Sequence, residues 1–504
     1  MRCPLALGLT TMLATLTLMP GAGVAQAPNT EPAPADEAAP PEPEDGASGE
    51  TAEAPEPPSS DAEIEGLEAP DETDEADEAG EADDPAAAEH AQATRSGPRI
   101  ELAPETPSDA GAEGPTAERE TDLLRGMQEE RFERAREGTM LGGYGELHYG
   151  LSVPEGDGES EAELDLHRLV IFLAHRFDER FRFYVELEVE HALAGGDFPG
   201  EVGVEQAFVD WQILGEDLGL RAGVVLVPMG IVNQWHEPPV FHGVERPRVD
   251  KVIIPSTWRE GGVGVFGEPA EGLRYEAYLV GGLNPLRFRT SDGLRKGRQA
   301  IAESRADGLA LTGRLELEPM LGLVTGLSGY ASLAGPNAGE LQRQVGTDMM
   351  GAPIFQSVDA DVPVLGVSAD ARLRTHGLEA RAVAAYWSIG DTGLLADTVD
   401  QDGMSLGVDA PSAMLGFYAE LGFDLLSLVD SEQALVPFAR FEYYDTTFGH
   451  RDEAAQNSLA GTDLVFGLSY RPVPQVVFKT DLILRNPDEG SGATLFDLGV
   501  GWMF

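Results

Sequence analysis

The stretch Leu495-Phe496-Asp497-Leu498-Gly499-Val500-Gly501-Trp502-Met503-Phe504 decides the fold. Its residues alternate, so that one side collects Phe496, Leu498, Val500, Trp502 and Phe504. A period of two is that of a β-strand with one apolar face. A final strand closed by an aromatic residue, in a chain that starts with an export signal, predicts the last strand of an outer-membrane β-barrel.

The first 25 residues are expected to be a signal peptide. Arg2 supplies the positive charge, the apolar run extends from Leu5 to Met19, and small residues lead to a cleavage site after Ala25. Cys3 is the single cysteine, so cleavage leaves a chain without disulfides, thiolate catalysis or cysteine-based zinc sites. No later apolar run is long enough for a membrane-spanning helix.

Residues 26–115 are expected to be a disordered linker rich in Ala, Pro, Glu and Asp. Residues 28–122 contain 30 acidic residues and 3 arginines, with almost no aromatic residues. Such a segment cannot bury enough apolar surface to offset its ordering entropy. Two roles stay open: a solvated periplasmic spacer, or a tail that binds a basic partner or divalent cations. The acidic balance speaks against nucleic acid as a partner.

Residues 116–138 are expected to form a short helix or coiled coil. Leu123, Leu124, Met127 and Phe132 are its apolar positions, and Gly138 is a plausible end. The segment is either a helix that leads into the barrel or a trimerising stalk.

Residues 139–504 are expected to hold sixteen strands and to form the barrel. The strands are expected to begin near Met140, Glu163, Arg180, Val202, Gly219, Arg259, Leu273, Leu309, Leu323, Val362, Leu378, Ala413, Leu435, Asp463, Gln475 and Thr494. The connections between them alternate between long and short. Outer-membrane barrels have short periplasmic turns, longer outer loops and an even number of strands.

The strands at 181–190, 309–318 and 476–485 alternate between apolar and polar residues, so one face meets lipid and the other meets water. The residues expected to line the lumen are Arg182, Tyr184, Glu186, Glu188, Glu190, Arg314, Glu316, Lys479 and Asp481. The predicted fold is therefore all-β, a 16-stranded antiparallel transmembrane β-barrel. A ring of sixteen strands is too wide for side chains alone to fill, which predicts an aqueous channel.

The connection 229–258 is unusually long, apolar and aromatic for a surface loop. Folding inward against the barrel wall would bury its aromatic residues and narrow the channel. The alternative is a loop folded over the rim or into a subunit interface. The candidate constriction residues are Trp235, His236, Glu237, Phe241, Glu245, Arg246, Arg248 and Lys251.

Several motifs in and around this loop carry a family resemblance. They are Gly142-Gly143-Tyr144-Gly145-Glu146-Leu147-His148-Tyr149, His236-Glu237-Pro238-Pro239, Gly243-Val244-Glu245-Arg246-Pro247, Ile253-Ile254-Pro255 and Thr257-Trp258-Arg259-Glu260. The chain thereby resembles the phosphate-selective porin O and P superfamily in its broad sense, over residues 140–504. The resemblance implies a sixteen-stranded outer-membrane channel, a homotrimer, with a third loop that constricts the pore.

The family name does not settle the transported ion. Members that gave the family its name line their pores with basic residues, whereas Glu186, Glu188 and Glu190 form an acidic row here. Carboxylates in a lumen favour cations, so a weak cation preference is expected. The loop 284–307 is basic instead. It either funnels anions to the mouth, or binds lipopolysaccharide phosphates or acidic neighbours across the barrel.

No catalytic residue, cofactor or metal site is predicted. His148, His167 and Glu190 could face the same lumen, and imidazole with carboxylate is zinc or copper chemistry, but no close ligand spacing accompanies them. The Asp397–Gly403 stretch lacks the glutamate of a calcium loop.

The expected function is passive diffusion of small hydrophilic solutes or ions across the outer membrane of a Gram-negative bacterium. Outer-membrane lipid and lipopolysaccharide are the expected surroundings, with the N-terminal tail in the periplasm. The alternative is a non-conducting barrel that serves as a structural anchor or adhesin for the acidic tail.

Overall fold

A computed structural model describes residues 100–102, 138–194, 199–334, 342–350, 352–357, 362–399 and 405–504. The predicted signal peptide, and nearly all of the predicted linker and short helix, lie outside these residues and stay predictions. Within the linker, Ile100–Leu102 form strand β1, which pairs in parallel with Thr139–Leu141. No helix in the described part of the chain is long and apolar enough to cross a membrane.

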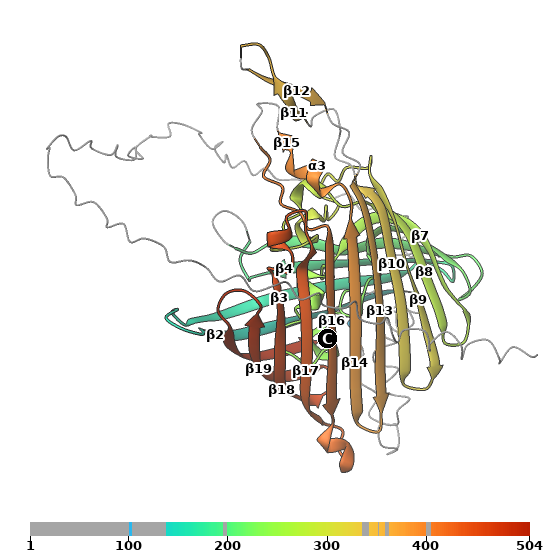
Figure 1. Cartoon of the computed structure of the whole chain (residues 1–504). Coiled ribbons are helices and arrows are strands. Elements are labelled where there is room, and N and C mark those ends of the chain that lie inside the picture. Colours follow the sequence, from blue (N-terminus) through green and yellow to red (C-terminus); the bar gives the residue numbers. More distant parts are fainter. Residues whose placement is uncertain are drawn as a thin grey trace, which may run out of the picture. The chain divides into compact units, whose positions relative to one another are not determined.

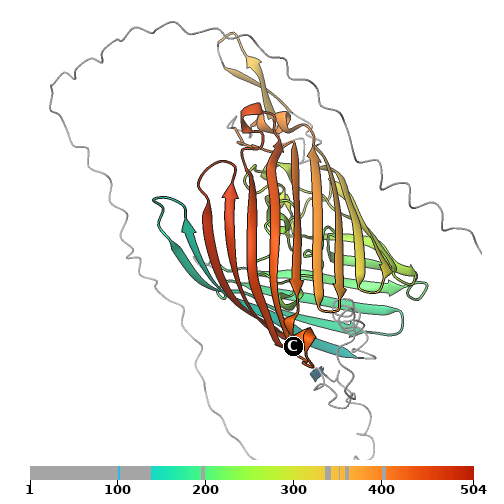
Figure 2. The ribbon, with the colours of Figure 1, turned by 60° about the horizontal axis from the view of Figure 1, so that its bottom comes forward.

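The molecule is a closed antiparallel β-barrel, as predicted (Figures 1 and 2). The main sheet has 17 strands, and without β1 the other sixteen pair in chain order around a ring. The ring closes where the last strand pairs with β2. There the backbones of Gly143 and Phe504 exchange hydrogen bonds of 3.0 and 2.9 Å. The terminal phenylalanine therefore takes part in the closure.

The sixteen strands begin within three residues of the predicted positions. They are β2 (Thr139–Pro154), β3 (Glu161–Arg176), β4 (Phe181–Glu190), β5 (Val202–Gln212), β6 (Gly219–Leu226), β7 (Arg259–Ala270), β8 (Leu273–Gly281), β9 (Leu309–Met320), β10 (Leu323–Ala334), β13 (Val362–Thr375), β14 (Leu378–Ile389), β16 (Ala413–Phe423), β17 (Ala434–Gly449), β18 (Ala460–Val473), β19 (Val476–Pro487) and β20 (Ala493–Met503).

The barrel is apolar outside and charged inside. On β9, Leu311 is 60% exposed while Arg314 is 5% exposed, and on β19 Phe478 is 50% exposed while Lys479 is 5% exposed. Successive residues of a strand point to opposite faces, so this alternation assigns Leu311 and Phe478 to the outer surface and Arg314 and Lys479 to the inner one. An exterior of this kind suits a bilayer, in which a closed barrel leaves no backbone group unpaired.

The connections alternate in length less strictly than predicted. The connections at 271–272, 321–322, 376–377 and 474–475 are tight turns at one end, and 227–258, 282–308 and 390–412 are long loops at the other. The expected long loops next to β2 and β20 shrink to 155–160 and 488–492, because the flanking strands extend further than predicted. The turn at 424–433 is longer than either, because it includes the 3₁₀ segment η5 (Leu425–Leu428).

The long loops contain small elements that the sequence analysis did not predict. A three-stranded sheet lies beyond one end of the barrel (Figures 1 and 2). It consists of β11 (Gln342–Thr347), β12 (Pro353–Ser357) and β15 (Thr398–Val399), and the short helix α3 (Thr392–Ala396) directly precedes β15. The remaining helical segments are η1 (Pro238–Val240), α2 (Val249–Val252), η2 (Pro285–Arg287), η3 (Arg295–Gly297) and η6 (Glu453–Ala455).

Candidate pore and inner loop

Residues 227–258, called the inner loop from here on, connect β6 to β7 and lie inside the barrel. The Nζ of Lys479 donates a hydrogen bond of 2.8 Å to the carbonyl oxygen of Gly243, and the Val244 amide donates one of 2.7 Å to Asp481 Oδ2. Lys479 and Asp481 belong to β19, far around the ring from β6 and β7. The loop therefore crosses the lumen.

An apolar cluster fastens the second half of the inner loop to the wall. Val249, Ile253 and Trp258 are fully buried. The Trp258 ring lies 4.9 Å from the ring of Tyr330 and 5.9 Å from that of Trp387. Each buried side chain of this size contributes about 1.5–3 kcal/mol. The apolar residues of the loop are thus explained, because they form a hydrophobic core with the inner face of the barrel.

Charged groups fasten the first half of the inner loop. Arg168 Nε donates to Glu146 Oε1 at 2.5 Å, and Arg168 Nη2 donates to the backbone carbonyl of His236. The His236 Nε2 lies 3.5 Å from Glu205 Oε2. Burial by itself lowers the pKa of His236, but the charge and hydrogen bond of Glu205, together with the charges of Glu186 and Glu237, outweigh burial and raise that pKa. His236 is therefore held by Arg168 of β3 through its backbone and by Glu205 of β5 through its ring.

The middle of the inner loop is also packed against the wall. His242 Nε2 lies 3.0 Å from Glu379 Oε2, yet burial dominates and lowers the pKa of His242. The Nζ of Lys479 lies 3.6 Å from the ring centre of Phe241. Glu237 is buried as well. These expected constriction residues hold the loop in place more than they border open space.

The charged side chains of Glu245 and Lys251 are more open. Lys251 Nζ pairs with Glu245 Oε2, and their side chains are 37% and 29% exposed. His148 Nδ1 lies 2.9 Å from Glu245 Oε1. Burial tends to raise the pKa of Glu245, but Lys251 and His148 outweigh it and hold that pKa well below its usual value. Glu245 is therefore a carboxylate at neutral pH.

Arg246 and Arg248 are half-buried. Arg246 Nη1 donates to Thr257 Oγ1 at 2.6 Å, and the guanidinium of Arg248 lies 4.7 Å from the ring centre of Tyr444. Burial lowers the pKa of Arg246, as does Arg168, while nearby carboxylates oppose the change.

The acidic row expected on β4 points inward, but two of its three carboxylates are buried. Glu186 and Glu188 are 1% and 3% exposed. Gln206 Nε2 donates to Glu186 Oε2 at 2.5 Å, and Glu188 Oε2 lies 3.7 Å from Arg259 Nη1. Glu190 is half-buried at the end of the strand. Of the three, Glu190 has the freest access to the lumen.

Tyr184, also expected to line the lumen, points inward but is packed between aromatic rings. Its ring stacks 5.9 Å from that of Phe172 and 5.4 Å from that of Phe208. Tyr184 is buried and so does not border an open path.

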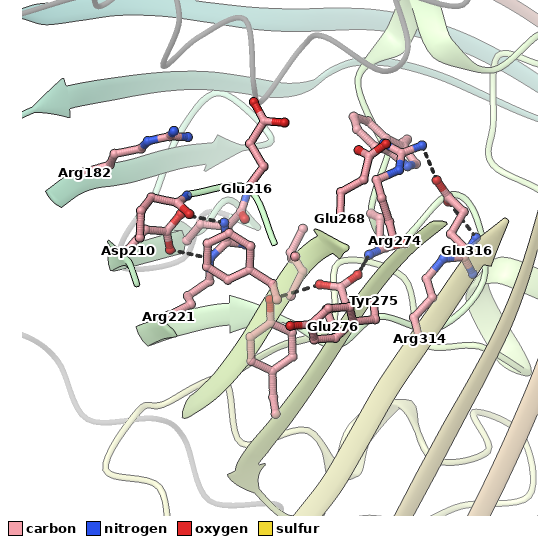
Figure 3. A pocket seen from close by; sticks show the side chains of 18 residues that line it. Arg182, Asp210, Glu216, Arg221, Glu268, Arg274, Tyr275, Glu276, Arg314 and Glu316 are labelled. Carbon is pink, nitrogen blue, oxygen red and sulfur yellow. Dashed lines mark hydrogen bonds and ion pairs between the residues drawn. The ribbon is translucent and has the colours of Figure 1, made fainter. Parts of the chain in front are cut away.

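A cavity of about 280 Å³ lies between the inner loop and the part of the barrel wall next to the short connections 213–218 and 271–272; its charged side chains are shown in Figure 3. Arg221 pairs with Asp210 through two hydrogen bonds of 2.7 and 2.9 Å, and Arg274 pairs with Glu316 at 2.5 Å. Trp235 of the inner loop borders the cavity. Its lining is charged, with both signs present.

The predicted wall residues Arg182, Arg314 and Glu316 all border this cavity. Arg314 also donates to both oxygens of Asp370, at 2.6 and 2.8 Å. The Arg221–Asp210 pair was not predicted from the sequence, although the period-two pattern of β5 and β6 is the signal that places both residues on the inner face.

The loop between β8 and β9 carries the basic residues whose role was left open. Arg298 Nη1 donates to the backbone carbonyl of Ser256, and Arg295 Nη1 lies 3.4 Å from Ser256 Oγ. Both contacts fall at the end of the inner loop. These two arginines therefore stabilise the end of the inner loop through hydrogen bonds to Ser256.

A protein of Aquifex aeolicus (strain VF5), described as uncharacterized, is 32% identical to this chain over 383 residues. The match covers 74% of this chain and 81% of that protein. A comparison with protein-family models finds no match. The resemblance to the phosphate-selective porin O and P superfamily is therefore not confirmed.

Solved barrel structures are similar to the chain at low identity. Salmonella typhi OmpF in complex with daunomycin is 12% identical, with a TM-score of 0.47, covering 74% of this chain and 99% of that one. The outer membrane channel DcaP of Acinetobacter baumannii is 11% identical, with a TM-score of 0.45 and coverage of 73% and 97%. An anion-selective porin from Comamonas acidovorans is 11% identical, with a TM-score of 0.43 and coverage of 73% and 99%. At these TM-scores, the fold rests on the strand pairing of the chain itself.

Proposed function

We propose that this chain, which belongs to the same family as the Aquifex aeolicus protein, is an outer-membrane porin for passive diffusion of small hydrophilic solutes or ions. The main support for the proposal is the distribution of side chains in the closed barrel, which is the reverse of that in a water-soluble protein. Apolar side chains such as Leu311 and Phe478 face outward, and the charged side chains of the strands face inward. Such a cylinder is stable in lipid and surrounds an aqueous space.

In this proposal the inner loop sets the width of the channel. The path runs between the open charges of the loop, Glu245, Arg246 and Lys251, and the wall residues Glu190 and Arg259, all of which are half-buried. Charges of both signs meet there, so a permeating ion experiences a strong field within a short distance.

Conductance of the full-length protein in a planar lipid bilayer tests the proposal. The protein is purified in detergent and added to one side, and the heat-denatured protein is the control. Stepwise increases in current with the folded protein are the expected result. Silence at every voltage, with a barrel shown to be folded by its heat-modifiable electrophoretic mobility, would contradict the proposal.

A non-conducting barrel is the second candidate, and one observation favours it. The lumen contains a hydrophobic core in which Trp258, Ile254 and Phe288 are fully buried. A barrel filled in this way would act as an anchor or adhesin for the acidic tail. The bilayer experiment separates the two functions directly.

The remaining expectations are parts of the same proposal. They are a homotrimeric assembly, contact with outer-membrane lipid and lipopolysaccharide, an N-terminal tail in the periplasm, and a place in the phosphate-selective porin O and P superfamily. They are supported by the barrel architecture and by the motifs around the inner loop.

A further inference from the structure

We propose that Asp165, His167, His191, His148 and Glu245 form a lumenal binding site for a divalent transition-metal ion such as Zn²⁺ or Co²⁺. The site would contain three imidazoles and two carboxylates, from three neighbouring strands and the inner loop. It depends on the barrel fold, and it does not depend on whether the barrel conducts.

Strand register brings the first three ligands together. Arg168 points inward on β3, and a β-bulge at His167, where the pairing moves from Glu146–Arg168 to Leu147–Leu166, shifts the alternation so that His167 and Asp165 also point inward. His191 directly follows β4, and its amide lies 3.4 Å from the carbonyl oxygen of His167. Asp165 Oδ2 lies 2.8 Å from His191 Nδ1 and 3.3 Å from His167 Nδ1. One carboxylate oxygen therefore lies between two imidazoles.

The second set of ligands shares His167. His148 on β2 pairs in register with Asp165, and its ring stacks on that of His167 at a centroid distance of 4.7 Å and an angle of 12°. His148 Nδ1 lies 2.9 Å from Glu245 Oε1 of the inner loop. In each of the two triads, ligand atoms all lie within 4.8 Å of one another.

These distances are close to those of a metal centre. Zinc binds nitrogen and carboxylate oxygen at about 2.0–2.2 Å, so two ligand atoms on one tetrahedral ion lie roughly 3.5 Å apart. Small side-chain rotations are therefore enough to bring either triad onto an ion. Two imidazoles with one carboxylate, and open positions for water, suit borderline ions such as Zn²⁺ and Co²⁺ better than Ca²⁺ or Mg²⁺.

The surroundings leave the cluster accessible. The side chains of His167, His191 and Asp165 are 33%, 34% and 17% exposed. His191 and Ala192 both have positive φ, at 54° and 59°, a conformation that costs a residue with a side chain about 1–3 kcal/mol. This strained turn is what directs the His191 ring toward Asp165.

An ion bound by His148, His167 and Glu245 would also join the inner loop to the wall. Glu245 is held only by Lys251 and His148 among the contacts that the structure describes for its side chain. Metal binding at this triad is therefore expected to restrain the part of the loop that borders the proposed path.

Metal binding to the full-length protein in detergent tests the site. Equilibrium dialysis against Zn²⁺ or Co²⁺ measures the stoichiometry, and visible absorption of bound Co²⁺ reports nitrogen and oxygen ligation. The wild type is expected to bind about one ion at micromolar concentration. The double variant His167→Gln, His191→Gln is expected to bind at least about tenfold more weakly, because it removes ligands from both triads.

His450→Gln is the matched control, because His450 also pairs with an aspartate, Asp409, but lies on another connection. It is expected to bind metal like the wild type. Equal binding by the wild type and the double variant, with both folded by circular dichroism, would overturn the proposal. Displacement of Co²⁺ by equimolar Mg²⁺ would also overturn it. A barrel that is silent in the bilayer but binds Co²⁺ would reject the porin function and leave the metal site standing.

Discussion

Asp250, on α2 of the inner loop, is a buried carboxyl group within the barrel. It is 1% exposed, and the groups that act on it are Tyr418 of β16, Arg440 and Glu442 of β17, and Arg246 of the loop. Burial raises the pKa of Asp250 from its ordinary value of 3.8 to about 7. Between these two values the unfolded chain has lost the proton and the folded chain has kept it. Stability therefore falls as pH rises through this window.

Asp250→Asn is expected to remove this pH dependence. Relative to the wild type, the variant should gain stability on the order of 2–3 kcal/mol between about pH 5 and pH 8, because the amide cannot ionise. Urea unfolding of the full-length protein in detergent micelles at the two pH values measures the gain. Asp430→Asn, at an exposed turn, is the control and should show no such change. A constant gap between Asp250→Asn and the wild type at both pH values would refute the expectation.

At the scale of the element, the inner loop is held by a hydrophobic core and by a few charged contacts. Trp258 belongs to the hydrophobic core. Lys479 makes two of the charged contacts, because its Nζ donates to the carbonyl oxygen of Gly243 and lies over the ring of Phe241. The core keeps the second half of the loop in place when a single polar contact is lost. Val240, Phe241 and Val244 in the middle of the loop are buried too, but they lie outside the large apolar cluster around Trp258, so this part of the loop should respond to such a change.

Lys479→Met is therefore expected to loosen the middle of the inner loop. Loss of this hydrogen bond costs about 1 kcal/mol, which corresponds to roughly a fivefold rise in the detached state. Single-channel recording should show a larger and noisier open current. Arg485→Gln is the control on the same strand, because Arg485 pairs with Asp463 of the wall and not with the loop. An unchanged current in Lys479→Met, or the same change in both variants, would refute the expectation.

The strands could be predicted from the sequence, and the clusters between strands could not. Alternation along 181–190 predicted which residues of β4 point inward, because the period is local to one strand. The proximity of Asp165 to His191, and of His148 to His167, depends on register between strands, which no local pattern contains. The sheet of β11, β12 and β15 was missed because its strands are short and lie within loops.

At the scale of the whole molecule, net charge is a poor guide to the field inside the barrel. Half of the acidic excess lies in residues 28–122, and residues 123–504 still hold 58 acidic against 30 basic residues. Inside the barrel, however, Arg314 pairs with Asp370, and Arg440 pairs with Glu420 and Glu442. Paired charges largely cancel at a distance. An ion in the lumen therefore responds mainly to the charges that remain open, such as that of Glu190.

Weak cation preference is still the expected behaviour of the channel, with Glu190 as its main source on β4. Glu190→Gln should shift the reversal potential in a potassium chloride gradient toward anions. Glu186→Gln should shift it much less, because Glu186 is 1% exposed and accepts a hydrogen bond from Gln206. Glu186→Gln is thus a matched control that removes the same charge from the same strand. Clear anion preference in the wild type would contradict the expected sign, and equal shifts in the two variants would show that exposure does not decide which carboxylates act on the ion.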